Sequence, residues 1–180
     1  MIVLLGFMGC GKSTLGPLLA LCLGRAFLDL DREIEREAGR SVAALFSAEG
    51  EAAFRERERR VFQRLAGQFD GVLCVGGGLP AQPGMDGELA RAGDCLYLDV
   101  PLACLVERLT DPAEATRRPL LAALPADARA AFIRELHARR DPAYRRAGRT
   151  VALPAEESAL DHLDRLLAAL RTPSTQGDRA

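Results

Sequence analysis

The sequence stretch with the clearest chemical meaning lies close to the N-terminus. Residues 6–14 read GFMGCGKST and match the pattern GxxxxGK[ST], in which backbone N–H groups surround the phosphates of a nucleotide. Glycines supply backbone conformations that other residues resist, and the N-terminus of a following helix adds a favourable dipole. In this pattern Lys12 contacts the β and γ phosphates, and the Ser13 hydroxyl binds Mg²⁺. The motif predicts nucleotide binding and leaves the reaction open.

Cys10 lies inside this motif, near a predicted helix N-terminus, a setting that can favour a thiolate. Because no resolving cysteine is paired with it in the sequence, we interpret Cys10 as a small side chain that fits the loop and give it no catalytic role. The residues assigned to nucleotide binding within the motif are Gly9, Cys10, Gly11, Lys12, Ser13 and Thr14.

Two carboxylates, Asp29 and Asp31, stand at the end of a predicted strand. Residues two apart in a strand project to the same side, which here should face the phosphate loop. One carboxylate can hold a metal-bound water while the other accepts a hydrogen bond from an acceptor hydroxyl, as phosphoryl transfer requires. The alternative is a strand followed by a helix whose first turn favours acidic residues. The pattern alone leaves both interpretations open.

A charged segment at residues 50–60 is typical of a solvated helix face with salt bridges, and we keep that interpretation for most of its charges. Arg55 and Glu58 differ because they are three apart on one helical face, beside Phe54. Glu58 can hold the Arg55 guanidinium in place for a bound carboxylate. The segment therefore contains one candidate carboxylate-binding arginine.

Three further segments have residues suited to ligand contacts. The GGG at residues 76–78 follows a predicted strand and leaves bare N–H groups that another molecule can approach closely. Residues 111–123 contain Arg117 and Arg118 and are predicted to form a mobile flap, from which an arginine reaches the transferred phosphoryl group only on closure. Residues 140–146, RDPAYRR, offer a second carboxylate clamp, with a solvated helix end as the alternative.

These segments must be positioned by elements that the hydrophobic pattern predicts. Five short apolar runs are typical of strands buried on both faces, and helical sequence separates each run from the next. The pattern predicts an α/β fold with a parallel sheet, covered by helices on both sides, whose binding loops follow the carboxyl ends of the strands. The predicted strands cover residues 2–5, 26–30, 72–75, 95–100 and 149–153.

The helices at the two ends of the chain are the most regular. The first is predicted over residues 12–23, with an apolar face that includes Leu15 and Cys22 at a spacing of seven. The last is predicted over residues 159–170, where leucines repeat at helical spacing. Residues 172–180 contain a proline, a glycine and polar residues, which predict a frayed tail.

Composition excludes several classes of function. The 180 residues carry 24 basic and 25 acidic side chains, so no global basic field is available for nucleic acid or anionic lipid. Five cysteines without CxxC spacing are typical of reduced thiols in cytosol. The apolar start lacks a basic n-region, and no apolar run approaches the ~18 residues of a membrane span. We expect one cytoplasmic domain at residues 1–171 that binds neither nucleic acid nor membrane.

Taken together, these motifs resemble those of the shikimate kinase family, from Met1 to about Leu170. The resemblance implies the fold of nucleoside monophosphate kinases, a five-stranded parallel sheet in the order 2-3-1-4-5. It also implies an acceptor-binding part at about residues 31–60 and a lid at about residues 110–123. The implied reaction is transfer of the γ-phosphoryl group of ATP, bound with Mg²⁺, to the 3-hydroxyl of shikimate. A monomer is the default expectation.

The resemblance also assigns roles to individual residues. In the DxD pair, Asp29 binds the metal ion through water, and Asp31 binds the acceptor hydroxyls and is the candidate base. Whether Asp31 acts as a true base stays open, because a loose phosphoryl transition state demands little proton abstraction. In the FRxxE segment Arg55 binds the substrate carboxylate. The supporting residues are Phe46, Phe54 and Glu58.

The remaining implied contacts involve the GGG, the RPLL at residues 118–121 and the YR at residues 144–145. They are Gly76, Gly77 and Gly78 to the acceptor, Arg118 in the lid to the nucleotide and the phosphoryl group, Arg145 as the second carboxylate ligand, and Arg108 stacked on adenine. The resemblance therefore implies that Lys12, Asp31 and Arg118 carry the catalysis.

Two other functions stay as alternatives. A gluconate kinase shares the fold class and also phosphorylates a hydroxylated acid. A nucleotide-binding module without chemistry would keep the phosphate loop but would have no use for two carboxylate-binding arginines. A nucleoside monophosphate kinase is a weaker alternative, because its acceptor needs a phosphate and base pocket. The combined set of Asp31, Arg55, Gly77 and Arg145 favours shikimate, a small hydroxylated carboxylate.

Overall fold

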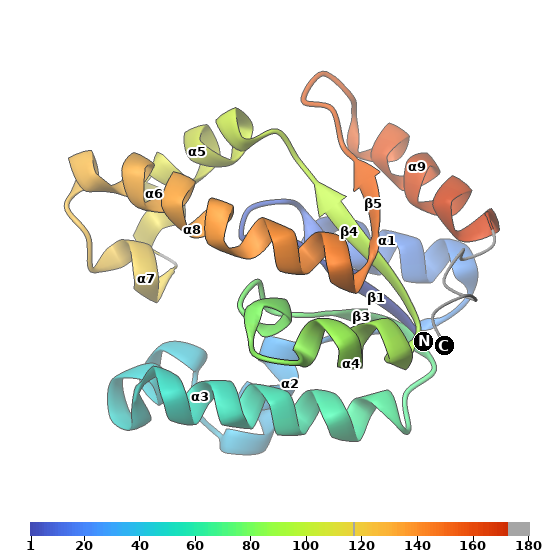
Figure 1. Cartoon of the computed structure of the whole chain (residues 1–180), viewed down its shortest axis with the longest axis horizontal. Coiled ribbons are helices and arrows are strands. Elements are labelled where there is room, and N and C mark those ends of the chain that lie inside the picture. The colour runs from blue at the N-terminus through green and yellow to red at the C-terminus, as the bar shows by residue number, and fades with distance from the viewer. Residues whose placement is uncertain (117, 173–180) are drawn as a thin grey trace.

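Five strands form one parallel sheet in the computed structural model, which describes residues 1–116 and 118–172. The strand order is β2-β3-β1-β4-β5, which confirms the predicted order (Figure 1). In the central strand, Leu4 is paired with Cys74 on one side and with Leu96 on the other. The strands are β1 (Ile2–Leu5), β2 (Ala26–Asp29), β3 (Gly71–Cys74), β4 (Asp94–Asp99) and β5 (Arg149–Ala152).

The apolar sequences of the central strands explain why helices cover the sheet on both faces. Every residue of β1 and of β3 is buried, so neither face of these strands tolerates water. Figure 1 shows α1 and α9 on one face of the sheet and α4 and α8 on the other. The helices are α1 (Lys12–Leu23), α2 (Leu30–Ala38), α3 (Val42–Ala66), the short 3-10 helix η1 (Leu79–Ala81), α4 (Met85–Ala92), α5 (Leu102–Thr110), α6 (Pro112–Thr116), α7 (Pro119–Ala122), α8 (Ala126–Ala147) and α9 (Ala159–Arg171).

The first helix has the predicted bounds, and its buried face overlaps the predicted one only in part. Cys22, which the apolar spacing places on the buried face, is exposed. Gly16 instead lies so close to Phe27 and Cys74 that a Cβ atom would not fit. The helix therefore packs through a small residue, which the leucine spacing does not reveal. Its buried residues are Leu15, Gly16, Leu19 and Ala20.

The second strand is shorter than predicted, because a helix begins at Leu30. Asp29 caps this helix, and its Oδ1 accepts hydrogen bonds from the N–H groups of Asp31 (3.0 Å) and Arg32 (3.3 Å). Asp31 therefore lies in the first turn of α2. The prediction that both aspartates share one side of a strand is wrong, and the helical alternative describes the local structure.

The long helix α3 is kinked at Gly50, whose φ of 79° and ψ of 171° suit glycine alone. Glu49, just before the kink, pairs with Arg57 after it (3.0 Å) and with Arg40 before the helix (2.6 Å). These ion pairs brace the kink from both sides. The kink matters for the site because it lies between Phe46 and the arginine-bearing part of α3.

The last helix is confirmed, and Ser158 caps it with a hydrogen bond to the N–H of Asp161. Of the predicted tail, residues 173–180 lie outside the described residues, as does Arg117 of the predicted flap. Within residues 1–116 and 118–172, no helix combines the length and apolarity that crossing a membrane requires.

Candidate active site

Two cavities that share one wall lie beside the carboxyl ends of β1, β2 and β3. The phosphate-loop cavity, of about 360 Å³, contains residues of the GxxxxGKS motif. The arginine cavity, of about 460 Å³, contains Arg55 and Arg140. A ligand bound in one cavity can therefore contact a ligand bound in the other at the shared wall. The residues that line both are Met8, Asp31, Gly76, Gly77 and Arg118.

The phosphate loop has the backbone conformation that its glycines predict. Gly9 and Gly11 have φ values of 79° and 96°, and α1 begins directly after Gly11. The Lys12 ammonium donates hydrogen bonds to the carbonyls of Gly6 (2.7 Å) and Phe7 (3.0 Å). Its Nζ also lies 3.5 Å from the sulfur of Cys10, which is buried. The loop thus holds a single cation at its centre, while Ser13 and Thr14 line the same cavity.

The two aspartates meet the phosphate-loop cavity although they are not arranged as a strand pair. Asp31 also reaches the arginine cavity. Burial raises the pKa of Asp31 to about 7, and the charges of Glu58 and Asp29 add to this effect while Lys12 opposes it. A carboxyl group with such a pKa can accept or hold a proton near neutral pH.

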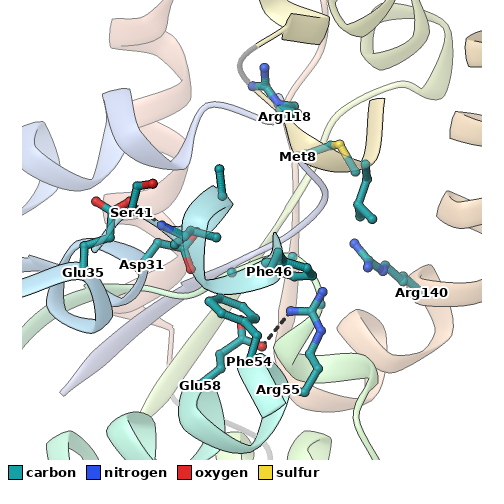
Figure 2. A pocket seen from close by; sticks show the side chains of 16 residues that line it. Met8, Asp31, Glu35, Ser41, Phe46, Phe54, Arg55, Glu58, Arg118 and Arg140 are labelled. Atoms are coloured by element: carbon teal, nitrogen blue, oxygen red, sulfur yellow. Dashed lines mark hydrogen bonds and ion pairs between the residues drawn. The ribbon is translucent and has the colours of Figure 1, made fainter. Parts of the chain in front are cut away.

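The predicted pair of Arg55 and Glu58 is present on α3, and a dashed line marks it in Figure 2. Nη1 of Arg55 donates to Oε2 of Glu58 at 2.8 Å, and Glu58 is fully buried. Burial opposes the charged form of Arg55, but the carboxylates of Glu58 and Glu51 together outweigh it and raise the pKa of Arg55. Gln82, which the sequence did not single out, donates to the same oxygen of Glu58 at 2.8 Å.

The two supporting phenylalanines lie around this pair. The rings of Phe46 and Phe54 are 4.4 Å apart, and the guanidinium carbon of Arg55 is 5.6 Å and 5.4 Å from their centroids. Arg55 is therefore fixed by a carboxylate and by two aromatic rings. Its side chain is still 19% exposed, so a ligand in the cavity can reach it.

The GGG segment allows charged side chains to approach the backbone. A Cβ atom on Gly78 would lie 2.6 Å from the guanidinium carbon of Arg55, and one on Gly76 would collide with Oε1 of Glu58. On Gly77 it would lie 3.2 Å from the carbonyl of Gly6 in the phosphate loop. The glycines are needed because the protein's own side chains and backbone occupy the space beside them. Their predicted contacts with a ligand stay a prediction.

The second arginine of α3 and α8 that lines this cavity is Arg140. The prediction that Arg145 is the second carboxylate ligand therefore needs correction. Both residues lie on α8, but Arg140 is 9% exposed and lines the arginine cavity. Arg145 is 48% exposed and pairs with Asp141 (2.8 Å) and Asp99 (3.0 Å). Residues that are five apart on an α-helix point to different sides, because only separations such as three, four or seven return to the same face. Arg140 and Arg145 therefore point in different directions.

A signal in the sequence could have found Arg140. Tyr144 is a large aromatic residue in an otherwise charged segment, and it is fully buried. The residue four positions before it shares its helical face. Arg140 therefore belongs on the buried face of α8, whereas Arg145 follows Tyr144 directly and turns away from it.

In the lid region, Arg118 lines both cavities and donates to the carboxylate of Glu114 at 2.6 Å. The structure thus places this predicted residue at the shared wall. Arg108 is exposed, and its Nη1 donates to the carbonyl of Gly9 at 3.2 Å. It lies against the phosphate loop, and its stacking on adenine stays a prediction.

Comparison with known proteins points to one family. A family model described as "Shikimate kinase" matches residues 8–171. The shikimate kinase of Chlorobium chlorochromatii is 41% identical over 172 residues, which cover 92% of this chain and 89% of that protein.

Solved structures of shikimate kinases are also similar to this chain. A shikimate kinase from Acinetobacter baumannii in complex with shikimate is 34% identical and superposes with a TM-score of 0.83, covering 94% of this chain and 92% of the other. A gluconokinase from Sinorhizobium meliloti is 21% identical with a TM-score of 0.52, over 94% of this chain and 90% of the other. The second similarity concerns the fold alone.

Proposed function

The chain belongs to the shikimate kinase family, and from this premise we propose how its own residues divide the work of the reaction. The activity is phosphoryl transfer from ATP to a hydroxyl group of shikimate. ATP occupies the phosphate-loop cavity, and shikimate occupies the arginine cavity. The two ligands meet at the shared wall, where Asp31 and Arg118 lie.

The observation that carries this assignment is a buried arginine without a carboxylate partner. Within residues 1–116 and 118–172, no carboxylate lies at ion-pair distance from Arg140, although its side chain is buried. Burial lowers the pKa of Arg140, and the nearby charge of Arg55 lowers it further. Two guanidinium groups that repel each other beside one cavity form a site for an anion. The carboxylate of shikimate supplies that anion.

Figure 2 supports the same assignment. It shows the guanidinium groups of Arg55 and Arg140 at one end of the cavity, the first from α3 and the second from α8. Arg118 is labelled at the opposite end of the cavity, on the side of the phosphate loop. A small acid bound with its carboxylate at the two arginines therefore presents its hydroxyl groups toward the phosphates.

At the phosphate end, Lys12 provides the positive charge. Its ammonium donates hydrogen bonds to the carbonyls of Gly6 and Phe7. When ATP binds, one of these hydrogen bonds is replaced by hydrogen bonds to the β and γ phosphate oxygens. Arg118 adds a second cation, which neutralises charge that develops on the transferred group. The reaction therefore depends mainly on positioning and electrostatics.

The residues of the phosphate-loop cavity also fit Mg²⁺, which prefers oxygen ligands. The Ser13 hydroxyl would bind the ion directly, and Asp29 would bind it through water. One oxygen of Asp29 is engaged as the cap of α2, which leaves the other for that water. When bound, the ion would supply positive charge that reduces the negative charge of the phosphates.

Asp31 orients the acceptor hydroxyl at the shared wall. Its raised pKa allows it to take the proton of that hydroxyl as the new bond to phosphorus forms. The bond to the bridging oxygen of ADP breaks in the same step, and the proton leaves Asp31 for solvent afterwards. The site of transfer on shikimate is the 3-hydroxyl, as the resemblance implies.

A coupled ADP-release assay tests this function with purified protein, ATP and Mg²⁺. The acceptors are shikimate, gluconate and a nucleoside monophosphate. We expect turnover with shikimate and a kcat/KM at least about 100-fold lower with the others, because their polar groups leave the arginines or Asp31 without partners. Equal or faster turnover with gluconate would contradict the proposal. Light scattering of the same sample tests the predicted monomer.

A further inference from the structure

The hydroxyl group of Tyr144 binds a residue that lines the arginine cavity, Gly77. Tyr144 is fully buried on α8, and its hydroxyl donates a hydrogen bond to the carbonyl of Gly77 at 2.6 Å. Burial raises the pKa of this hydroxyl, and the nearby charge of Arg140, one helical turn earlier, opposes the shift. One hydroxyl therefore contacts the glycine loop after β3, and it comes from the buried face of α8 that also carries Arg140.

Gly77 is a sensitive point for such a contact. It lines both cavities, and its Cα faces the carbonyl of Gly6 and the N–H of Met8 in the phosphate loop. A shift of its carbonyl would therefore move the wall that the two ligands share. The hydrogen bond from Tyr144 fixes this carbonyl relative to α8, and thereby relative to Arg140.

The ring of Tyr144 is itself held in place. Its centroid lies 5.1 Å from that of Tyr97 on β4, with an angle of 42° between the rings. The hydroxyl of Tyr97 donates to Asp141 at 2.7 Å, within the network that also binds Arg145. The two adjacent tyrosines thus direct their hydroxyls to different partners, Gly77 in the cavity wall and Asp141 in an ion-pair network.

We propose that Tyr144 is a positioning residue for acceptor binding, because its hydroxyl fixes Gly77 relative to α8, the helix that carries Arg140. This inference rests on the proposed function, in which Arg140 binds the carboxylate of shikimate. The residue touches neither the carboxylate nor the reacting hydroxyl. It sets the distance between the arginine that binds the acid and the glycine loop beside the acceptor.

The test compares Tyr144→Phe with Tyr97→Phe. Each variant removes one hydroxyl from the same ring pair, and chemical denaturation measures the loss of stability in each. We expect Tyr144→Phe to raise the KM for shikimate about tenfold, with kcat changed less than about threefold and the KM for ATP unchanged, because one buried hydrogen bond remote from the reacting atoms is lost. Tyr97→Phe should leave all three constants within about twofold. Equal effects of both variants, or an unchanged KM for shikimate in Tyr144→Phe, would overturn the inference.

A double-mutant cycle decides whether Tyr144 acts through Arg140. If it does, Tyr144→Phe in an Arg140→Ala background should raise the KM for shikimate less than about threefold further, well short of its effect alone. Additive effects would show that the hydroxyl acts independently of the arginine, and this part of the inference would be wrong.

Hydrogen exchange without any ligand separates this inference from the proposed function. In Tyr144→Phe, we expect amides of residues 76–82 to exchange about tenfold faster than in the wild type, because the loop loses its contact with α8. Tyr97→Phe should not change their exchange. Unchanged exchange in Tyr144→Phe would refute the positioning role even if shikimate is phosphorylated normally. Failure of the wild type to phosphorylate shikimate would refute the proposed function and leave the exchange result to decide the positioning role.

Discussion

The two cavities of the site differ in how the chain builds them. The phosphate-loop cavity takes much of its lining from residues 6–14, a continuous segment whose backbone surrounds one lysine. The arginine cavity is assembled from α2, α3, the loop after β3, the lid region and α8. Most of its polar side chains are charged, and three of them are arginines, Arg55, Arg118 and Arg140. A cavity made by local backbone tolerates changes in neighbouring side chains, whereas a cavity made by distant side chains depends on each of them.

Substitution of the single lysine tests the phosphate-loop side most severely. Lys12→Arg keeps the charge, but a planar guanidinium does not fit where Nζ lies 2.7 Å and 3.0 Å from two carbonyls. We expect kcat to fall by at least about 10³-fold, since the main cation on the transferred group is displaced. Steady-state kinetics measure this effect, and circular dichroism controls for folding. A loss below tenfold would show that charge alone suffices.

Substitution at the shared wall should have the next largest effect. Asp31→Asn removes the acceptor of the hydroxyl proton, and we expect kcat to fall about 10²-fold, as for the loss of a general base. ATP binding, measured by calorimetry, should remain intact because the phosphate loop is unchanged. Turnover near that of the wild type would remove the proposed role of Asp31.

Substitutions in the arginine cavity should mainly lower the affinity for the acceptor. Arg140→Ala removes a buried guanidinium, and we expect the KM for shikimate to rise about 30-fold with a much smaller change in kcat, as for a lost charge-assisted hydrogen bond. Arg145→Ala is the matched control on the same helix. Its ion pairs are exposed, so the KM should change less than about twofold. A larger effect from Arg145→Ala would restore the interpretation based on sequence alone.

The glycine loop should show how closely the arginine cavity is packed. Gly78→Ala places a methyl group 2.6 Å from the guanidinium carbon of Arg55, which must then move. We expect a rise of about fivefold in the KM for shikimate, smaller than the loss of an arginine because Glu58 still holds the side chain. Gly87→Ala on α4 is the control, since a Cβ there meets only the end of the Arg91 side chain at 3.5 Å. Equal KM values in both variants would contradict the proposed packing.

The same difference between the cavities explains what could be predicted from the sequence. The phosphate loop, the five strands and the pair of Arg55 and Glu58 follow from contiguous patterns, the strand order follows from the family resemblance, and the structure contains each of them. Arg140 was missed because two arginines on one helix can be told apart only by the face that α8 buries, and packing decides that face. The predicted position of Asp31 in a strand was wrong, because the Asp29 carboxylate caps a helix and the strand ends there.

Contacts that connect distant segments were the least predictable. Gln82 binds Glu58 across 24 residues, and Tyr144 binds Gly77 across 67 residues. Neither contact leaves a pattern in the local sequence, because each depends on how η1 and α8 lie against α3 and the glycine loop. The sequence could thus predict which residue types the site needs, while tertiary packing decides which copy of a residue type supplies them.

The smallest expected effect tests whether the phosphate loop works through its backbone. Cys10 is 2% exposed, and its sulfur lies 3.5 Å from Nζ of Lys12. Cys10→Ala removes this contact and leaves a small void, which should lower the free energy of unfolding by about 1 kcal/mol. The φ values of 79° and 96° at the flanking glycines do not depend on the thiol, so the N–H groups keep their directions. We therefore expect the KM for ATP and kcat to change less than about twofold, as kinetics and chemical denaturation can measure. A tenfold loss of kcat at unchanged folding would mean that the thiol positions Lys12, and the phosphate-loop cavity would then depend on its side chains as the arginine cavity does.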